Sequence, residues 1–181
     1  YGADALRTYV MFMGPLDRDK PWSQNGLVGT YKFLNKVWRM LHQEDGSFWI
    51  DDTEASEDIL RVTHQTIKKV TQDIENLAYN TAISQLMIFV NEVSKSSSRP
   101  KSVIKSFLQC LAPFAPHIAE ELWEKAGETG LISIAPWPNF NEEWAAAEKI
   151  TMAIQVNGKT KAKLEFDPDS EQNIVEAEAL K

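Results

Sequence analysis

The sequence has few of the residues on which enzymatic and metal chemistry usually depend. A single cysteine, Cys110, occurs in 181 residues, which excludes an internal disulfide. Its apolar helical surroundings favour a place in the core over a nucleophilic role. The three histidines, His42, His64 and His117, show no paired metal-ligand spacing. No glycine-rich loop follows a strand pattern, and no serine lies in a nucleophile-elbow motif. We therefore expect neither a catalytic site nor a metal site within this chain.

Long apolar runs are also missing. No segment approaches the ~20 apolar residues that a membrane-spanning helix needs, and no secretory signal pattern is present. These absences predict a cytoplasmic protein without a membrane partner. The chain begins at Tyr1, directly in a helical pattern, and so we expect it to be a piece of a longer protein.

Positive charge is in deficit, with 19 Lys and Arg against 26 Asp and Glu, for a net charge of -7. This balance argues against nucleic acid as a partner, because phosphates attract basic surfaces. A local basic stripe can still bind RNA, and for each stripe the alternative is a solvated face. The candidate stripes are Lys32, Lys36 and Arg39; Lys95, Arg99, Lys101 and Lys105; and Lys159, Lys161 and Lys163.

Apolar residues recur at helical spacing through most of the chain. Helices are predicted over residues 4–13, 26–42, 56–77, 81–95 and 100–111, and from 116 up to Gly127. Asn80 is the expected N-cap of the fourth helix. The expected packing seam of the third helix consists of Leu60, Thr63, Ile67, Val70, Ile74 and Leu77.

Two prolines interrupt the apolar stretch "LAPFAPHIAEELW". Pro113 cannot continue a helix without losing a hydrogen bond and clashing with the preceding turn, whereas Pro116 suits the first turn of a new one. We therefore predict a break between two helical segments. His117 falls in the first turn of the second segment, where a positive charge opposes the helix dipole. We expect a neutral His117 that caps or packs.

The pattern changes to an alternation of period two at Ile150, and Asn157-Gly158 is a hairpin signal. A three-residue loop with Gly158 at a bulge would pair Ile154 with Thr160, and so separate apolar from basic positions. The fold class that follows is mainly α: a helical bundle, then a short β-hairpin and a helix from a truncated α+β domain. The expected divisions are 1–20, a helix and linker; 21–148, the bundle; and 149–181, the start of a second domain.

Several stretches together resemble one family. The segments "YGADALR", "YKFLNKVWRM", "TIKKVTQDIENLAYNTAISQLM" and "LAPFAPHIAEELW" resemble the region after the KMSKS loop and the helical anticodon-binding domain of class I aminoacyl-tRNA synthetases. These motifs also admit valyl and isoleucyl relatives. The hairpin "IQVNGKTKAKLEF", after the "APWP" strap, resembles the start of the C-terminal domain of bacterial leucyl-tRNA synthetases. Pro21 departs from the acidic residue expected before the loop tryptophan.

The resemblance implies a parent enzyme that ligates leucine to its tRNA with ATP and Mg. The HIGH and KMSKS motifs and the editing domain are not in these residues, so the fragment itself should need no cofactor and catalyse nothing. The resemblance further implies that the fragment contacts the tRNA backbone and other domains of the parent, and that it does not bind DNA. The alternative from a different class is a helical protein-interaction module without RNA binding.

Overall fold

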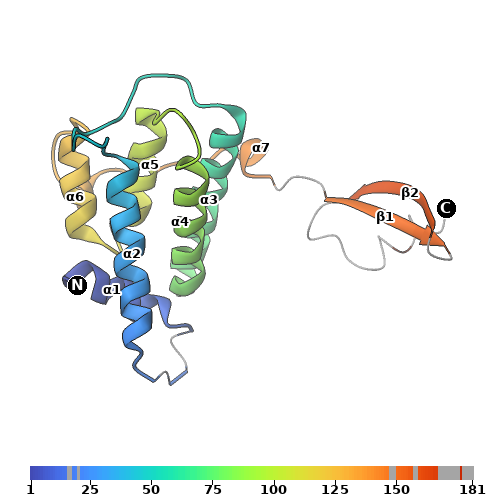
Figure 1. Ribbon diagram of the computed structural model, residues 1–181, viewed down its shortest axis with the longest axis horizontal. Helices are drawn as coiled ribbons and strands as arrows, with labels where there is room; N and C mark the ends of the chain where they lie inside the picture. The colour runs from blue at the N-terminus through green and yellow to red at the C-terminus, as the bar shows by residue number, and fades with distance from the viewer. Residues whose placement is uncertain (16–17, 20, 147–149, 157–158, 167–175, 177–181) are drawn as a thin grey trace. The chain divides into compact units, whose positions relative to one another are not determined.

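A computed structural model describes the chain except for residues 16–17, 20, 147–149, 157–158, 167–175 and 177–181 (Figure 1). The chain divides into two compact units, Tyr1–Ala145 and Ala146–Lys181. No helix among the described residues combines the length and the apolarity needed to cross a membrane. The fold is mainly helical, as the sequence predicts.

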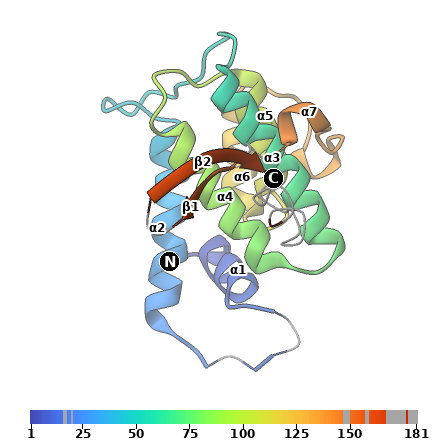
Figure 2. The ribbon, with the colours of Figure 1, turned by 90° about the vertical axis from the view of Figure 1, so that its right-hand side faces the viewer.

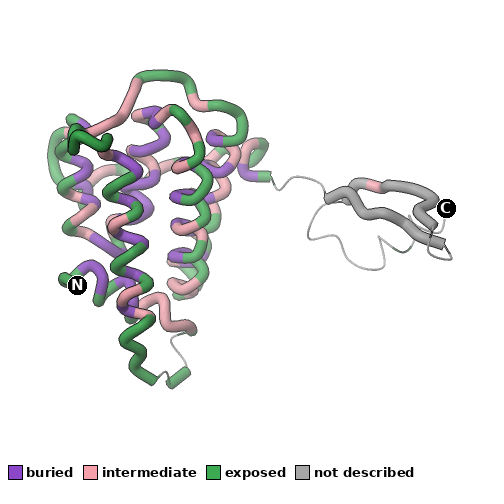
Figure 3. The backbone as a smooth tube through the Cα atoms, in the orientation of Figure 1, coloured by how far each residue is buried: buried purple, intermediate pink, exposed green. Residues whose placement is uncertain are grey.

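The first unit is a bundle of helices. Its elements are α1 (Ala3–Phe12), α2 (Gln24–Met40), α3 (Glu57–Glu75), α4 (Tyr79–Val93), α5 (Lys101–Leu111), α6 (Pro116–Lys125), a 3-10 turn η1 (Ile132–Ile134) and the short α7 (Glu142–Ala145). Figure 2 shows α3 and α4 towards the viewer, with α5 and α6 behind them and α2 at the left of the bundle. Buried residues line the inner faces of these helices (Figure 3).

The bundle core is built on the apolar positions of each helix. Val37 and Leu41 of the α2 region are fully buried, and Phe89 of α4 stacks on Phe107 of α5 with ring centroids 4.5 Å apart. The predicted proline break is confirmed, because α5 ends at Leu111 and α6 begins at Pro116.

Two local predictions about the third and fourth helices are wrong. Asn80 lies inside α4, whose N-cap residue is Ala78, so Asn80 does not cap the helix. Leu77 does not join the packing seam of α3: the helix ends at Glu75, and Leu77 has a φ of 56° and is 57% exposed. The left-handed backbone at Leu77 turns the chain before the heptad pattern is complete.

The second unit is described as two antiparallel strands, β1 (Ile150–Val156) and β2 (Lys159–Phe166). The predicted register is wrong by two residues, because Ile154 pairs with Ala162 and not with Thr160. The register shifts between the pairs Ile154–Ala162 and Gln155–Thr160, so the extra residue, Lys161, lies on β2. The bulge expected at Gly158 and the helix expected near Asp169 lie outside the described residues.

Candidate nucleic-acid interface

The first candidate stripe lies on the exposed side of α2. Ser23 caps the helix by accepting a hydrogen bond from the Gly26 N–H at 3.3 Å, which satisfies one free donor of the first turn. Lys32, Lys36 and Arg39 follow at spacings of four and three residues and are all exposed. The helix contains no acidic residue from Gln24 to Met40, so nothing within α2 neutralises these cations.

The stripe continues onto α4, which lies beside α2 (Figure 1). Lys36 Nζ donates to Asn91 Oδ1 at 2.5 Å and joins the two helices. The only acid of α4 is Glu92, and its carboxylate pairs with Lys95 at 2.7 Å. The name α2–α4 face is used below for the exposed residues Lys32, Lys36, Arg39, Ile88, Asn91 and Lys95.

Arg99 does not belong to any exposed stripe, which corrects the expectation from the sequence. Its side chain is buried, with 4% exposed. Nε donates to the Met40 carbonyl at 2.9 Å, and Nη1 donates to the carbonyls of Ser96 and Ser98 at 2.8 and 2.7 Å. The guanidinium also lies over the Trp49 ring, 4.6 Å from its centroid. These contacts occupy the group internally and leave it unavailable to a phosphate.

Lys101 and Lys105 are half-buried on α5 and share one acidic partner. Glu128 accepts from Lys105 Nζ at 2.7 Å and lies 3.5 Å from Lys101 Nζ. The hydrogen bond from Lys105 is the main reason that the pKa of Glu128 is below its ordinary value, with a smaller contribution from Lys101. One carboxylate facing two lysines leaves one excess positive charge, so this group is weaker than the stripe on α2.

Lys159, Lys161 and Lys163 all lie on β2, where Lys159 is paired with Val156 and Lys163 with Ala153. Their side chains are outside the described part of the structure.

The residues considered for catalysis take structural positions. Burial raises the pKa of the Cys110 thiol to about 12, which makes it a poor nucleophile. His117 Nδ1 lies 2.7 Å from Asp4 Oδ1, and the other oxygen of Asp4 accepts the Ile118 N–H at 2.8 Å. Asp4 thus caps α6 from a distant part of the chain, a partner that sequence spacing could not identify. Within the described ranges, no group of three or more His, Cys, Asp and Glu residues could hold a metal ion.

Two members of the α2–α4 face were missed from the sequence. Asn91 was missed because it carries no charge. Ile88 was missed because an isoleucine in a helix is expected to lie in the core, although here it is exposed. The available signal was the scarcity of acids along residues 79–95, which a count of basic residues alone does not register.

An uninterrupted basic helix face on a helical bundle fits a module that contacts nucleic acid through its phosphates. The sequence model of one protein family, the anticodon-binding domain of tRNA ligase, matches residues 56–177, and the chain belongs to this family.

The individual proteins to which the chain is similar belong to a narrower group, the leucine–tRNA ligases. The chain is 46% identical over 181 residues to the leucine–tRNA ligase of Leptospira biflexa and 45% identical over 178 residues to that of Bdellovibrio bacteriovorus. It spans 20% and 22% of their lengths, while 99% and 98% of the chain is covered. The Agrobacterium radiobacter K84 agnB2 LeuRS, solved in a ternary complex with tRNA and LeuAMS, matches with a TM-score of 0.72 and 28% identity, over 99% of this chain and 25% of that one.

Proposed function

We propose that this chain is the tRNA-contacting portion of a leucine–tRNA ligase. The leucine–tRNA ligases to which it is similar support the assignment, as does the tRNA in the solved complex of a similar fold. The chain spans about a fifth of the length of these relatives, so the activity belongs to a longer protein. That protein would use ATP and Mg to join leucine to its tRNA in the cytoplasm, with catalysis and editing outside these residues.

Within the longer protein, residues 1–20 would form the end of the catalytic region, residues 21–148 the anticodon-binding bundle, and residues 149–181 the beginning of a C-terminal tRNA-binding domain of α+β class. The division of the chain after Ala145 supports the second boundary. Other domains of the same protein would supply further affinity for tRNA.

The observation that carries the proposal is the charge distribution of the α2–α4 face. The chain as a whole has seven more acids than bases, yet α2 has no acid and the single acid of α4 is paired with Lys95. A phosphate backbone laid along this face would therefore meet Lys32, Lys36 and Arg39 without repulsion from a neighbouring carboxylate. Such contacts position the RNA and carry little sequence information. Lys101 and Lys105, with Lys159, Lys161 and Lys163, are proposed as weaker additional contacts.

The test is a salt titration of leucine tRNA binding with the 181-residue chain. A triple variant changes Lys32, Lys36 and Arg39 to Ala. Each phosphate contact adds about 0.9 to the slope of log K against log salt concentration on duplex RNA, by analogy with B-DNA, and about 0.7 on single strands. Loss of three contacts should therefore lower the slope by about 2 to 3.

A variant with Lys68 and Lys69 changed to Gln serves as the matched control. These residues lie on α3 and are paired with Glu142 and Asp73. Their removal changes net charge but should leave the slope within about 0.5. Equal slopes for the wild-type chain and the triple variant would contradict the assignment of the face. A folded chain that binds no tRNA at low salt would favour a protein-interaction module.

A further inference from the structure

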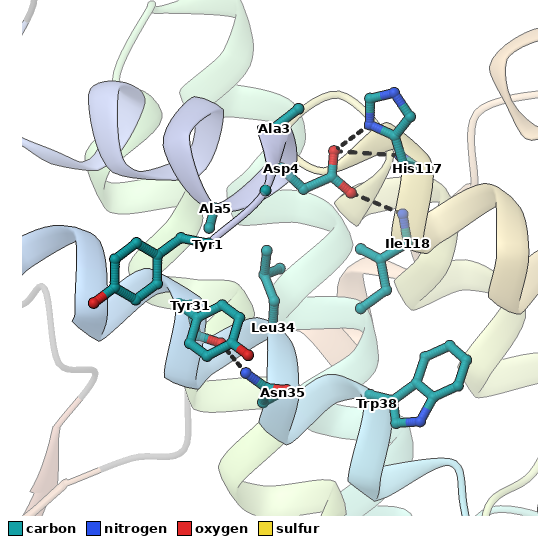
Figure 4. Close-up of a pocket in the computed structure, with 11 residues that line it drawn as sticks. Tyr1, Ala3, Asp4, Ala5, Tyr31, Leu34, Asn35, Trp38, His117 and Ile118 are labelled. Carbon is teal, nitrogen blue, oxygen red and sulfur yellow. Dashed lines mark hydrogen bonds and ion pairs between the residues drawn. The ribbon is translucent and has the colours of Figure 1, made fainter.

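A hollow of about 490 Å³ lies next to the α2–α4 face, between α1, α2 and α6 (Figure 4). Tyr31, Leu34, Asn35 and Trp38 line it from α2, at the spacing of one helix face. His117 and Ile118 line it from α6, and Figure 4 shows their side chains on the opposite side from Tyr31. The hollow is of the size that holds a small aromatic ligand.

The walls of the hollow carry exposed aromatic rings. Tyr31 is 41% exposed and Trp38 is 36% exposed, on a helix whose inner face is packed into the core. Exposed aromatic rings at a hollow favour a partner with a flat apolar surface, because burying such rings releases water. Asn35 lies between them, with Nδ2 donating to the Tyr31 carbonyl at 2.9 Å.

The hollow is held in shape by contacts behind its lining. The Trp38 indole stacks on the His42 ring, with centroids 4.1 Å apart and an interplanar angle of 16°. Asp4 joins α1 to α6 through its bonds to His117 and Ile118. A site with fixed walls loses little conformational entropy when a ligand enters.

The surroundings of the hollow are basic. Lys32, Lys36 and Arg39 directly follow Tyr31, Asn35 and Trp38 in the sequence, so the basic row lies about 100° around α2 from the row that lines the hollow. Lys125 Nζ lies 5.9 Å from the centroid of the Trp38 ring, but it is paired with Glu121 at 3.2 Å and so adds no net charge. Asp4, the acid that lines the hollow, is committed to the N-terminus of α6. This distribution favours an occupant that joins a flat ring to a negative charge.

We propose that the hollow binds one unpaired nucleotide of the RNA, with its base against Tyr31 and Trp38 and its phosphates on the basic residues of α2. The inference rests on the proposed function and deepens it, because it adds a preference for unpaired RNA to a face that otherwise reads only phosphates. Stacking accepts any base, so this site selects single-stranded structure and not sequence.

The experiment compares two RNAs of equal nucleotide number with the complete 181-residue chain. One is a hairpin with 2-aminopurine in its unpaired loop, and the other is a fully paired duplex. Tyr31→Ala and Trp38→Ala should each weaken hairpin binding about 5- to 150-fold, the range covered by loss of one base–aromatic stack. Duplex binding should stay within about twofold. Trp38→Phe should retain most of the affinity for the hairpin.

Trp22→Ala is the control, because Trp22 is 59% exposed and is not among the residues that line the hollow. It should leave both affinities unchanged. Tyr31→Ala keeps the test decisive if Trp38→Ala disturbs the stack on His42. Quenching of 2-aminopurine on binding to the wild-type chain, and its loss in both variants, would support the proposal.

Two results separate this inference from the proposed function. Unchanged hairpin affinity in both variants, or equal weakening on hairpin and duplex, would overturn the nucleotide site while leaving the phosphate contacts in place. If neither RNA binds the folded chain at low salt, the proposed function fails, and the site with it. Loss of a protein–protein contact with unaltered RNA affinity would assign the hollow to a protein segment and refute the proposal.

Discussion

Arg99 provides the sharpest test of how the bundle uses a basic residue. Its guanidinium makes three hydrogen bonds to the carbonyls of Met40, Ser96 and Ser98 and lies over Trp49. Burial lowers the pKa of the Arg99 guanidinium, and the nearby charge of Asp51 opposes this shift. The group ties the start of α5 to the end of α2, and so we expect its loss to destabilise the fold and to leave RNA affinity unchanged.

The magnitude follows from the contacts that each substitution removes. Arg99→Ala leaves three carbonyls without their donor, at about 1 kcal/mol each, and removes a cation–π contact of about 0.5–2 kcal/mol. The free energy of unfolding should fall by about 3 to 5 kcal/mol. Arg99→Lys keeps the charge, but an ammonium cannot reproduce the planar fork of donors, and we expect about half of that loss.

Urea denaturation followed by tryptophan fluorescence measures this change in the first unit alone, because all six tryptophans lie at or before Trp144. Lys95→Ala is the control: Lys95 is exposed and pairs with the exposed Glu92, and its removal should cost less than about 0.5 kcal/mol. If Arg99→Lys kept full stability, or if Arg99→Ala weakened tRNA binding while the chain stayed folded, the structural role would be refuted.

Two further predictions concern carboxylates. Partial burial raises the pKa of Asp51, but hydrogen bonds from the Arg99 N–H and from Thr53 outweigh it and leave the pKa below the ordinary value of 3.8. The contribution of Asp51 to stability is therefore present above about pH 4 and is lost as the pH falls through the lowered pKa. Asp51→Asn should be less stable than the wild-type chain at pH 6 and should approach its stability near pH 2.5. Urea denaturation midpoints at the two pH values measure this difference. Asp4→Ala removes the cap of α6 and the bond to His117, and should lower the free energy of unfolding by about 1–3 kcal/mol in the same assay; an unchanged midpoint would refute the capping role.

The helices were predictable from the sequence because each has a strong local signal. Apolar spacing identified the inner faces of α2 and α4, and Pro116 marked the start of α6. The details that failed depend on tertiary structure. Leu77 fits the apolar period of α3, but the turn into α4 removes it from the seam, and nothing in its immediate neighbours announces that turn. The predicted register of β1 and β2 failed similarly, because the extra residue, Lys161, lies inside β2, where the alternation of the sequence gives no sign of a bulge.

The candidate site was predictable only where charge and exposure coincide. Lys32, Lys36 and Arg39 are spaced to share one face of a helix that needs its other face for the core, and so they had to be exposed. Arg99 precedes Pro100 at the start of α5. An arginine at such a position can point into solvent or donate hydrogen bonds to the free carbonyls at the end of a neighbouring helix. Sequence proximity to Lys95 and Lys101 could not separate these two uses.

Net charge is a poor guide to the partner of this chain, for a reason visible in how its acids are placed. Acidic residues concentrate in the segment 44–58, and several others, such as Asp4 and Glu128, are engaged with helix ends or lysines. Screening limits the reach of an exposed charge to about 8 Å at physiological ionic strength. A phosphate on the α2–α4 face is therefore governed by the nearby lysines and arginine and not by the acids elsewhere, which is how an acidic chain can present a local surface for RNA.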